Sequence, residues 1–155
     1  TAREAAEPFR PLAESRGIRY ELDIQPGLSL NGDETAIREL VTILADNAVK
    51  YAGPRGSASL ILRPQGDEAV LSVHNTGEPI PPEHLPNVKK KFYKANQTVR
   101  GSGIGLALAD EIMRLHSGSL EIESHENVGT VVTIRIPAFL EKAPDAAQDT
   151  ERISE

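Results

Sequence analysis

Residues 100–108 read Arg-Gly-Ser-Gly-Ile-Gly-Leu-Ala-Leu, with glycine at 101, 103 and 105 and an apolar helical pattern directly behind them. Alternate glycines let a backbone approach a ligand closely and adopt positive φ. A helix that begins behind such a loop presents unpaired N–H groups and the positive end of its dipole, and both favour phosphate. The pattern predicts a helix over 104–116, ended by Gly118, whose buried face carries Ile104, Leu108, Ile112 and Leu115.

Spacing separates this loop from three other glycine-rich motifs. A dinucleotide fold requires G-x-G-x-x-G behind a strand, whereas position 106 is Leu, and a Walker loop requires a Gly-Lys pair, which the chain lacks. The glycine loop of protein kinases lies between two strands, whereas a helix follows here. A loop that only caps a helix stays open as an alternative.

Composition limits the classes of protein that this chain can represent. Its 155 residues suit one domain with a sizeable core, and 39% hydrophobic with 26% charged residues is an ordinary globular composition. Cysteine is absent, which excludes disulfides, thiolate metal sites and cysteine nucleophiles. No apolar run approaches the ~20 residues of a membrane span. The first residues lack an initiator Met and resemble no signal peptide, so we expect an excised piece of a longer protein.

The net charge of −6 is unevenly distributed. Residues 87–103 contain five basic residues and no acidic one, a local charge of +5, so the remainder carries −11. A basic strip beside a glycine loop in an acidic protein favours a small anionic ligand over nucleic acid. A solvated lysine cluster at Lys89–Lys91 is the alternative.

The order of apolar patterns predicts the fold. We expect a helix at 3–16, one from the N-cap Asp33 to about Tyr51, a helical turn at 83–88, and strands at 19–24, 57–63, 69–74, 119–124 and 130–137. These elements predict a two-layer α/β sandwich: a mixed, mostly antiparallel sheet of about five strands, with about three helices on one face. Residues 1–138 form the predicted domain, with a mobile lid at 94–102. Residues 139–155 form a polar tail that we expect to be disordered.

Two further stretches carry candidate chemistry. Asn47, Lys50 and Tyr51 project from nearly the same side of their predicted helix. An amide oxygen beside an ammonium group suits Mg²⁺ with a phosphate, although both side chains could simply cap their own helix. Residues 74–77, His-Asn-Thr-Gly, end a predicted strand. Asn75 there could accept a hydrogen bond from an exocyclic amine, and a plain Asx turn is the locally favoured alternative.

Together these sites resemble the ATP-binding catalytic domain of sensor histidine kinases, in the superfamily shared with gyrase, MutL and the heat-shock-90 chaperones. The resemblance covers roughly residues 2–138, and the family fold agrees with the predicted sandwich. Four boxes occur in the right order: the N box at 46–51, the first glycine box at 75–81, the end of the F box at 91–94 and the second glycine box at 101–106. Residues 115–118 and 129–130 match the later His-Gly-Gly and Gly-Thr landmarks.

The resemblance implies an ATP·Mg²⁺ site. Asn47 would ligate Mg²⁺, Lys50 would contact phosphate and Asn75 would read adenine. Catalysis would rest on Asn47, Lys50 and Arg100, by positioning and charge neutralisation. The implied nucleotide contacts are Asn47, Lys50, Tyr51, Asn75, Gly77, Ile80, Tyr93, Lys94, Arg100, Gly101, Ser102, Gly103, Ile104, Gly105, Leu106 and Thr130.

The chain departs from the family pattern at four positions. Ile43 stands where hydrolysing relatives have a Glu that activates water, so we expect little intrinsic ATP hydrolysis. Asn75 replaces the adenine-reading Asp; its amide oxygen can still accept from the adenine amine. Pro79 replaces a glycine and stiffens the loop beneath the base. Lys89 replaces an aromatic residue of the F box, which changes how the base of the lid is anchored.

The phosphoacceptor is missing from the sequence. Sensor kinases phosphorylate a histidine on a helical hairpin, usually within His-Glu-x-x-x-Pro, and the four histidines here do not fit that pattern; His116 is interpreted as a helix-end residue. The resemblance thus implies a protein-histidine kinase catalytic domain that cannot autophosphorylate alone.

Its expected partners are ATP, a histidine-bearing dimerisation domain and a response regulator, without nucleic acid. We expect a monomeric fragment of a homodimeric, cytoplasmic or membrane-anchored parent. Two alternatives stay open. One is a stand-alone serine kinase of the anti-sigma-factor type, and the other is a degenerate module that binds partners without nucleotide.

Overall fold

The computed structural model describes residues 1–87, 89 and 105–140. The helices in these residues are α1 (Ala2–Ala6), η1 (Glu7–Phe9), α2 (Arg10–Ser15), α3 (Glu34–Tyr51), η2 (Leu85–Asn87) and α4 (Gly105–Leu115). The strands are β1 (Arg19–Ile24), β2 (Leu28–Ser29), β3 (Ser57–Gln65), β4 (Glu68–Asn75), β5 (Ser119–His125), β6 (Gly129–Pro137) and β7 (Phe139–Leu140).

The main sheet has five strands in the order β1-β3-β4-β6-β5. β1 and β3 are parallel, with α3 between them in the chain, and the other neighbours are antiparallel. The β3–β4 hairpin turns at Gly66-Asp67, where Gly66 has φ +64°. Pro64 is tolerated near the end of β3 because pairing with β1 stops at Leu62. The predicted mixed, mostly antiparallel sheet is confirmed.

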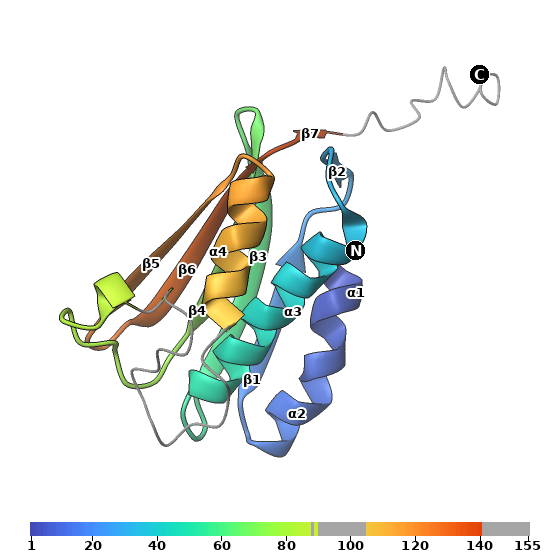
Figure 1. The fold of residues 1–155 in the computed structure, drawn as a ribbon. Coiled ribbons are helices and arrows are strands. Elements are labelled where there is room, and N and C mark those ends of the chain that lie inside the picture. The colour runs from blue at the N-terminus through green and yellow to red at the C-terminus, as the bar shows by residue number, and fades with distance from the viewer. Residues whose placement is uncertain (88, 90–104, 141–155) are drawn as a thin grey trace.

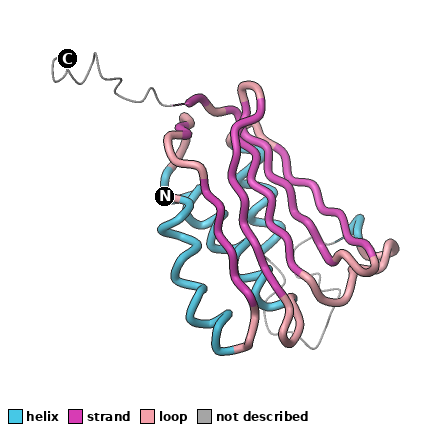
Figure 2. Tube along the Cα trace, turned by 180° about the vertical axis from the view of Figure 1, so that it is seen from behind, coloured by secondary structure: helices cyan, strands magenta, loops and turns pink. Residues whose placement is uncertain are grey.

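The helices form the second layer of the sandwich. Figure 1 shows α1–α2, α3 and α4 on one face of the sheet, and Figure 2 shows the opposite face without helices. Alternate residues of each strand point into the core, as the period-2 pattern requires. The largest fully buried side chains are Leu44 and Val49 of α3, Met113 of α4, and Leu60 and Ile134 of the sheet. The predicted α/β sandwich with about three helical segments on one face is confirmed.

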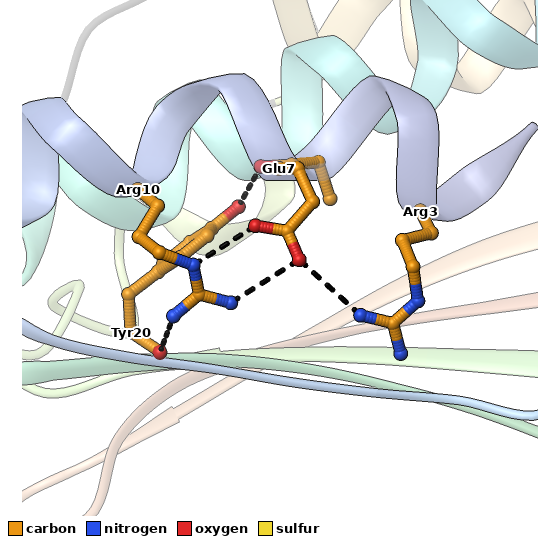
Figure 3. Close-up of polar contacts among 5 residues, drawn as sticks. Arg3, Glu7, Arg10 and Tyr20 are labelled. Carbon is orange, nitrogen blue, oxygen red and sulfur yellow. Dashed lines mark hydrogen bonds and ion pairs between the residues drawn. The ribbon is translucent and has the colours of Figure 1, made fainter.

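The helix predicted at 3–16 is interrupted by two prolines. Pro8 and Pro11 lack the N–H that an α-helix needs, and the chain forms the 3₁₀ turn η1 between α1 and α2. The turn leaves the Ala6 carbonyl without its α-helical donor. The Tyr20 hydroxyl of β1 donates to this carbonyl at 2.7 Å (Figure 3). Burial raises the pKa of Tyr20 to about 12.

Arg10 also connects the α1–α2 segment to β1, on the solvent side of the Tyr20 hydrogen bond. Its guanidinium donates to the Tyr20 carbonyl at 3.0 Å and to Glu7 at 2.9 Å, and lies 5.5 Å from the centre of the Tyr20 ring. Arg3 also donates to Glu7, at 3.3 Å. The α1–α2 segment is therefore fastened to β1 by one buried hydrogen bond and a cluster of partly exposed charges.

The buried face of α4 differs from the prediction. Ala109, Ile112 and Met113 are buried, whereas Leu108 and Leu115 are 37% and 72% exposed. Apolar residues occupy most sides of this helix, so the periodicity alone did not determine which side faces the sheet. Ile104, the fourth predicted core residue, lies outside the described residues.

The end of α4 also differs from the expected glycine stop. Ser117 takes the left-handed conformation, with φ +59°. The Ser117 and Gly118 N–H groups donate to the Arg114 and Met113 carbonyls, which is a Schellman motif. Gly118 is needed for another reason, because a Cβ there would lie 2.5 Å from the Arg135 carbonyl oxygen.

His116, predicted to be a helix-end residue, links two helices. Its Nε2 accepts from the Asp33 N–H at 3.1 Å, and its Nδ1 lies 2.8 Å from the Ile112 carbonyl. The end of α4 is thereby joined to the N-cap of α3.

A second, two-stranded sheet pairs β2 with β7 and was not predicted. It extends the paired backbone two residues beyond the predicted boundary at residue 138. The rest of the predicted tail, 141–155, lies outside the described residues. No helix in the described part of the chain is long and apolar enough to cross a membrane.

The Tyr20 hydroxyl provides a test of how the N-terminal segment is held. Tyr20→Phe removes the buried hydroxyl that donates to the Ala6 carbonyl and should lower the free energy of unfolding by about 1–2 kcal/mol at pH 7. Between pH 10 and 12 the unfolded chain loses the Tyr20 proton while the folded chain keeps it. Wild-type stability should therefore fall through this range by an amount that Tyr20→Phe lacks. Urea unfolding of both proteins across this pH range measures the difference, and parallel curves would contradict the prediction.

Candidate functional site

The half-exposed side of α3 carries the predicted metal and phosphate residues. Asp33 caps the helix by accepting from the Thr35 N–H at 2.9 Å. Asn47 and Lys50 lie beside this helix's buried side, and Lys50 forms an ion pair with Asp46 at 2.9 Å. Within the described residues, the Asn47 amide has no hydrogen-bond partner. In the part of the chain that the structure describes, an unpaired amide thus lies one helical turn from an ammonium group that pairs with a carboxylate.

Side chains of the first glycine box form hydrogen bonds with the C-terminal end of α3. The last carbonyls of a helix lack intrahelical donors. The Thr76 hydroxyl donates to the Ala52 carbonyl at 2.9 Å and accepts from the Ser57 N–H at 2.9 Å. The Asn75 amide nitrogen donates to the Tyr51 carbonyl at 3.3 Å. The end of β4 is therefore joined to the turn of α3 that directly follows Lys50.

These contacts fix the orientation of the Asn75 amide. Its nitrogen donates to two carbonyls, those of Tyr51 at 3.3 Å and Thr76 at 2.8 Å, and among the described residues its oxygen is an acceptor without a donor. Asn75 is buried, with 7% of its surface exposed. Its role as an acceptor for an exocyclic amine stays a prediction.

Two glycines allow the close approach of backbones at this site. Gly77 has φ +117°, and a Cβ there would lie 2.2 Å from the Tyr51 carbonyl oxygen. Gly129 has φ +99°, and a Cβ there would lie 2.0 Å from the Asn75 carbonyl oxygen. Neither position can accept a side chain without moving the backbone. Burial raises the pKa of Tyr51, which lies at the same helix end.

A row of polar side chains crosses the inner face of the sheet at this end. The strand register places Asn75 opposite Thr130, and Thr130 opposite Ser124. The Ser124 and Thr130 hydroxyls lie 2.9 Å apart, and the Ile80 N–H donates to Ser124 at 2.6 Å. Sequence reasoning named Asn75, Ile80 and Thr130 but missed Ser124 and the clamp at Thr76. The register of the predicted β5–β6 hairpin was the signal that could have found Ser124.

The start of α4 lies beside the middle of α3. A Cβ on Gly105 would lie 3.3 Å from Ile43 Cγ2, and Ile43 is one turn before Asn47. Leu106, the next residue, packs against the core. The structure thus brings nine predicted site residues to one end of the sandwich (Figure 1): Asn47, Lys50, Tyr51, Asn75, Gly77, Ile80, Gly105, Leu106 and Thr130. Tyr93, Lys94, Arg100, Gly101, Ser102, Gly103 and Ile104 lie outside the described residues.

Lys89 has an ionic anchor in place of the aromatic one expected in the F box. Its ammonium group lies 3.3 Å from Asp110 on α4 and 3.3 Å from the Leu120 carbonyl on β5. Among the described residues there is no group of three His, Asp or Glu side chains placed to hold a metal ion. A metal held mainly by phosphate oxygens, with one protein amide, fits this set of donors.

Comparison with known proteins identifies the family of this chain. Residues 32–139 match the family described as histidine kinase-, DNA gyrase B- and HSP90-like ATPases. The chain belongs to this family. The predicted resemblance, which rested on the order of the boxes, is confirmed.

Similar proteins include several sensor kinases. The sensor histidine kinase YkoH of Bacillus subtilis is 36% identical over 124 residues, which are 77% of this chain and 27% of that protein. The methanogenesis regulatory histidine kinase FilI of Methanothrix harundinacea is 35% identical over 79% of this chain and 14% of its own length. This chain therefore spans less than a third of these relatives.

Solved structures of histidine kinases are also similar to this chain. The mycobacterial sensor histidine kinase MprB has a TM-score of 0.79 and 25% identity, over 90% of this chain and 94% of that one. The catalytic domain of histidine kinase ThkA has a TM-score of 0.78 and 26% identity, over 88% and 89%. The similarity in this second case is to a catalytic domain alone.

The Thr76 clamp can be tested by removing one hydroxyl. Thr76→Val leaves the Ala52 carbonyl and the Ser57 N–H without their partner and should lower the free energy of unfolding by about 1–3 kcal/mol. Thr76→Ser keeps the hydroxyl and is the control, for which we expect a smaller loss. Urea unfolding of the three proteins measures this. Equal stability of the Val and Ser variants would show that the hydroxyl does not hold the end of α3.

Proposed function

We propose that this chain is the ATP-binding catalytic domain of a two-component sensor histidine kinase. In this proposal it donates the γ-phosphoryl group of ATP to a histidine on a helical domain that this sequence lacks. The observation that carries the proposal is the convergence at one end of the sandwich: the Asn47–Lys50 side of α3, the Asn75–Gly77 loop and the start of α4. Membership of the ATPase family and the kinase relatives support it.

Each group at the site has a role in this proposal. The Asn75 amide oxygen accepts from the adenine amine. Thr130 lies beside Asn75 in the sheet, and Ile80 bonds to Ser124 at the far end of the polar row. Asn47 supplies an oxygen to Mg²⁺, which neutralises phosphate charge when bound. Lys50 exchanges its partner Asp46 for a phosphate oxygen. The glycines at 101, 103 and 105 cradle the phosphates, with Arg100 and Lys94 approaching from the lid, as the sequence predicts.

Phosphoryl transfer asks little covalent chemistry of a protein, because positioning and charge stabilisation supply most of the catalysis. Ile43 agrees with a donor that does not hydrolyse its own ATP. It packs against the core and lies close to Gly105, and a hydrocarbon side chain cannot accept a proton from water. The γ-phosphoryl group is then reserved for the incoming histidine.

Two of the described histidines, His74 and His116, are engaged elsewhere in the fold, which supports a separate phosphoacceptor. His116 is held between Asp33 and Ile112, and His74 lies on the other face of the sheet from the site, with its Nε2 2.5 Å from the Val128 carbonyl. We propose that the parent protein is a cytoplasmic or membrane-anchored homodimer whose dimerisation domain supplies the histidine. A response regulator would accept the phosphoryl group next. A solved complex of ThkA with the response regulator protein TrrA, 26% identical with a TM-score of 0.73, supports this partner class.

Nucleotide titration tests the proposed site. A non-hydrolysable ATP analogue should bind wild type in the micromolar range, more weakly without Mg²⁺. Asn47→Ala should bind it about tenfold more weakly with Mg²⁺, and its affinity should no longer depend on the metal. Asn31→Ala, an exposed residue in the loop before α3, is the control. Calorimetry gives all the affinities, and the absence of binding by wild type would favour the degenerate partner module.

The identity of the phosphoacceptor is tested by transfer. With Mg·ATP alone the chain should release little phosphate and should stay unlabelled. Addition of a histidine-bearing helical domain from a sensor kinase should yield acid-labile phosphohistidine. Labelling of a serine on an antagonist protein would instead identify the anti-sigma-factor type of kinase, and rapid phosphate release would contradict the role given to Ile43.

A further inference from the structure

Ser124 joins the β5–β6 hairpin to the loop after β4, which is 44 residues away in the sequence. It lies on β5, its hydroxyl is 2.9 Å from that of Thr130 on β6, and it accepts the Ile80 N–H of the loop after β4 at 2.6 Å. Thr130 is 7% exposed and stands in the sheet between Ser124 and Asn75. Across the sheet, Thr130 is therefore the one residue between Ser124 and the base-reading amide of Asn75. Ser124 is hydrogen-bonded to Thr130 and to the Ile80 N–H.

Donors and acceptors can be followed along this row, from the Ile80 N–H through the Ser124 hydroxyl to the Thr130 hydroxyl. The Ile80 N–H can only donate, so it occupies one acceptor position of the Ser124 oxygen. When Ser124 gives its own hydrogen to Thr130, every hydrogen bond in the chain points the same way, and each donor is polarised by the one before it. The Thr130 hydrogen is then free to be donated onward to a ligand.

This direction matters for the choice of base. Adenine carries an amine donor beside a ring nitrogen that accepts, whereas guanine carries a carbonyl oxygen in place of the amine. Asn75 offers an acceptor, because its nitrogen is bound to two carbonyls. An acceptor at Asn75 beside a donor at Thr130 complements adenine and opposes guanine, which has a protonated ring nitrogen next to its carbonyl.

We infer that Ser124 is a positioning residue that orients the Thr130 hydroxyl as a donor toward adenine and so sets the preference for ATP over GTP. This inference rests on the proposed function and adds a residue that does not touch the nucleotide itself. A structural role alone would affect binding of the two nucleotides equally.

The test compares base discrimination in matched variants. ATP and GTP displace a fluorescent ATP analogue from the whole chain, and the ratio of the two affinities is measured. Ser124→Ala should weaken ATP binding about five- to tenfold and change GTP binding little, so that the ratio falls by a similar factor. Ser124→Thr keeps the hydroxyl and should preserve the ratio within about twofold. Ser119→Ala makes the same change on the other face of β5 and should preserve it too.

An ATP-to-GTP ratio that stays constant in Ser124→Ala overturns the inference, whether or not both affinities fall. If this variant does not fold, Ser124→Cys replaces it, because sulfur is a weak donor and acceptor in a side chain of the same shape. Failure of wild type to bind ATP would instead count against the proposed function. The two failures are therefore distinguishable.

Discussion

The capture of the last carbonyls of α3 by the end of β4 is the interaction on which the site depends. A helix end inside a protein must find donors for these groups. Here they come from Asn75 and Thr76, two neighbouring side chains of the first glycine box. Asn47 and Lys50 lie on the last turns of the same helix, so the bonds that complete the helix also bring this side of α3 close to the Asn75 amide. The same hydrogen bonds therefore complete the fold of α3 and assemble the site.

The position of the site follows from the two-layer architecture. Inner-facing residues of β4 and β6 are apolar along most of their length and become polar at Asn75 and Thr130, where the helical layer ends. The Asn75 amide nitrogen there donates to two backbone carbonyls, and the Ser124 and Thr130 hydroxyls bond to each other. Burial of such a row of polar side chains costs little free energy while their hydrogen bonds are made. The row also leaves specific donor and acceptor atoms for a ligand.

Much of the fold was predictable because the local signals were unambiguous. Alternating residues and a Pro-Gly stop gave β1 its observed ends at Arg19 and Ile24, and Asp33 marked the start of α3. The side of α4 was not predictable, because Leu108 and Ala109 are both apolar and only packing against the sheet distinguishes them. The motif order located Asn47 and Asn75. The Thr76 clamp and the Tyr20–Ala6 bond join different elements, and no local pattern reports such contacts. Ser124 could have been found only from the register of the β5–β6 hairpin.

The two outer strands of the sheet bear on how this domain behaves at high concentration. An edge strand presents unpaired backbone groups to which another chain can add. On β5 the Leu120 carbonyl is taken by Lys89, and Glu121 and Glu123 are exposed beside it. On β1, at the opposite edge, Arg19 and Glu21 are exposed. Charged side chains along both edge strands disfavour pairing with an edge strand of another copy. The solvent-exposed edges of the sheet therefore do not promote aggregation.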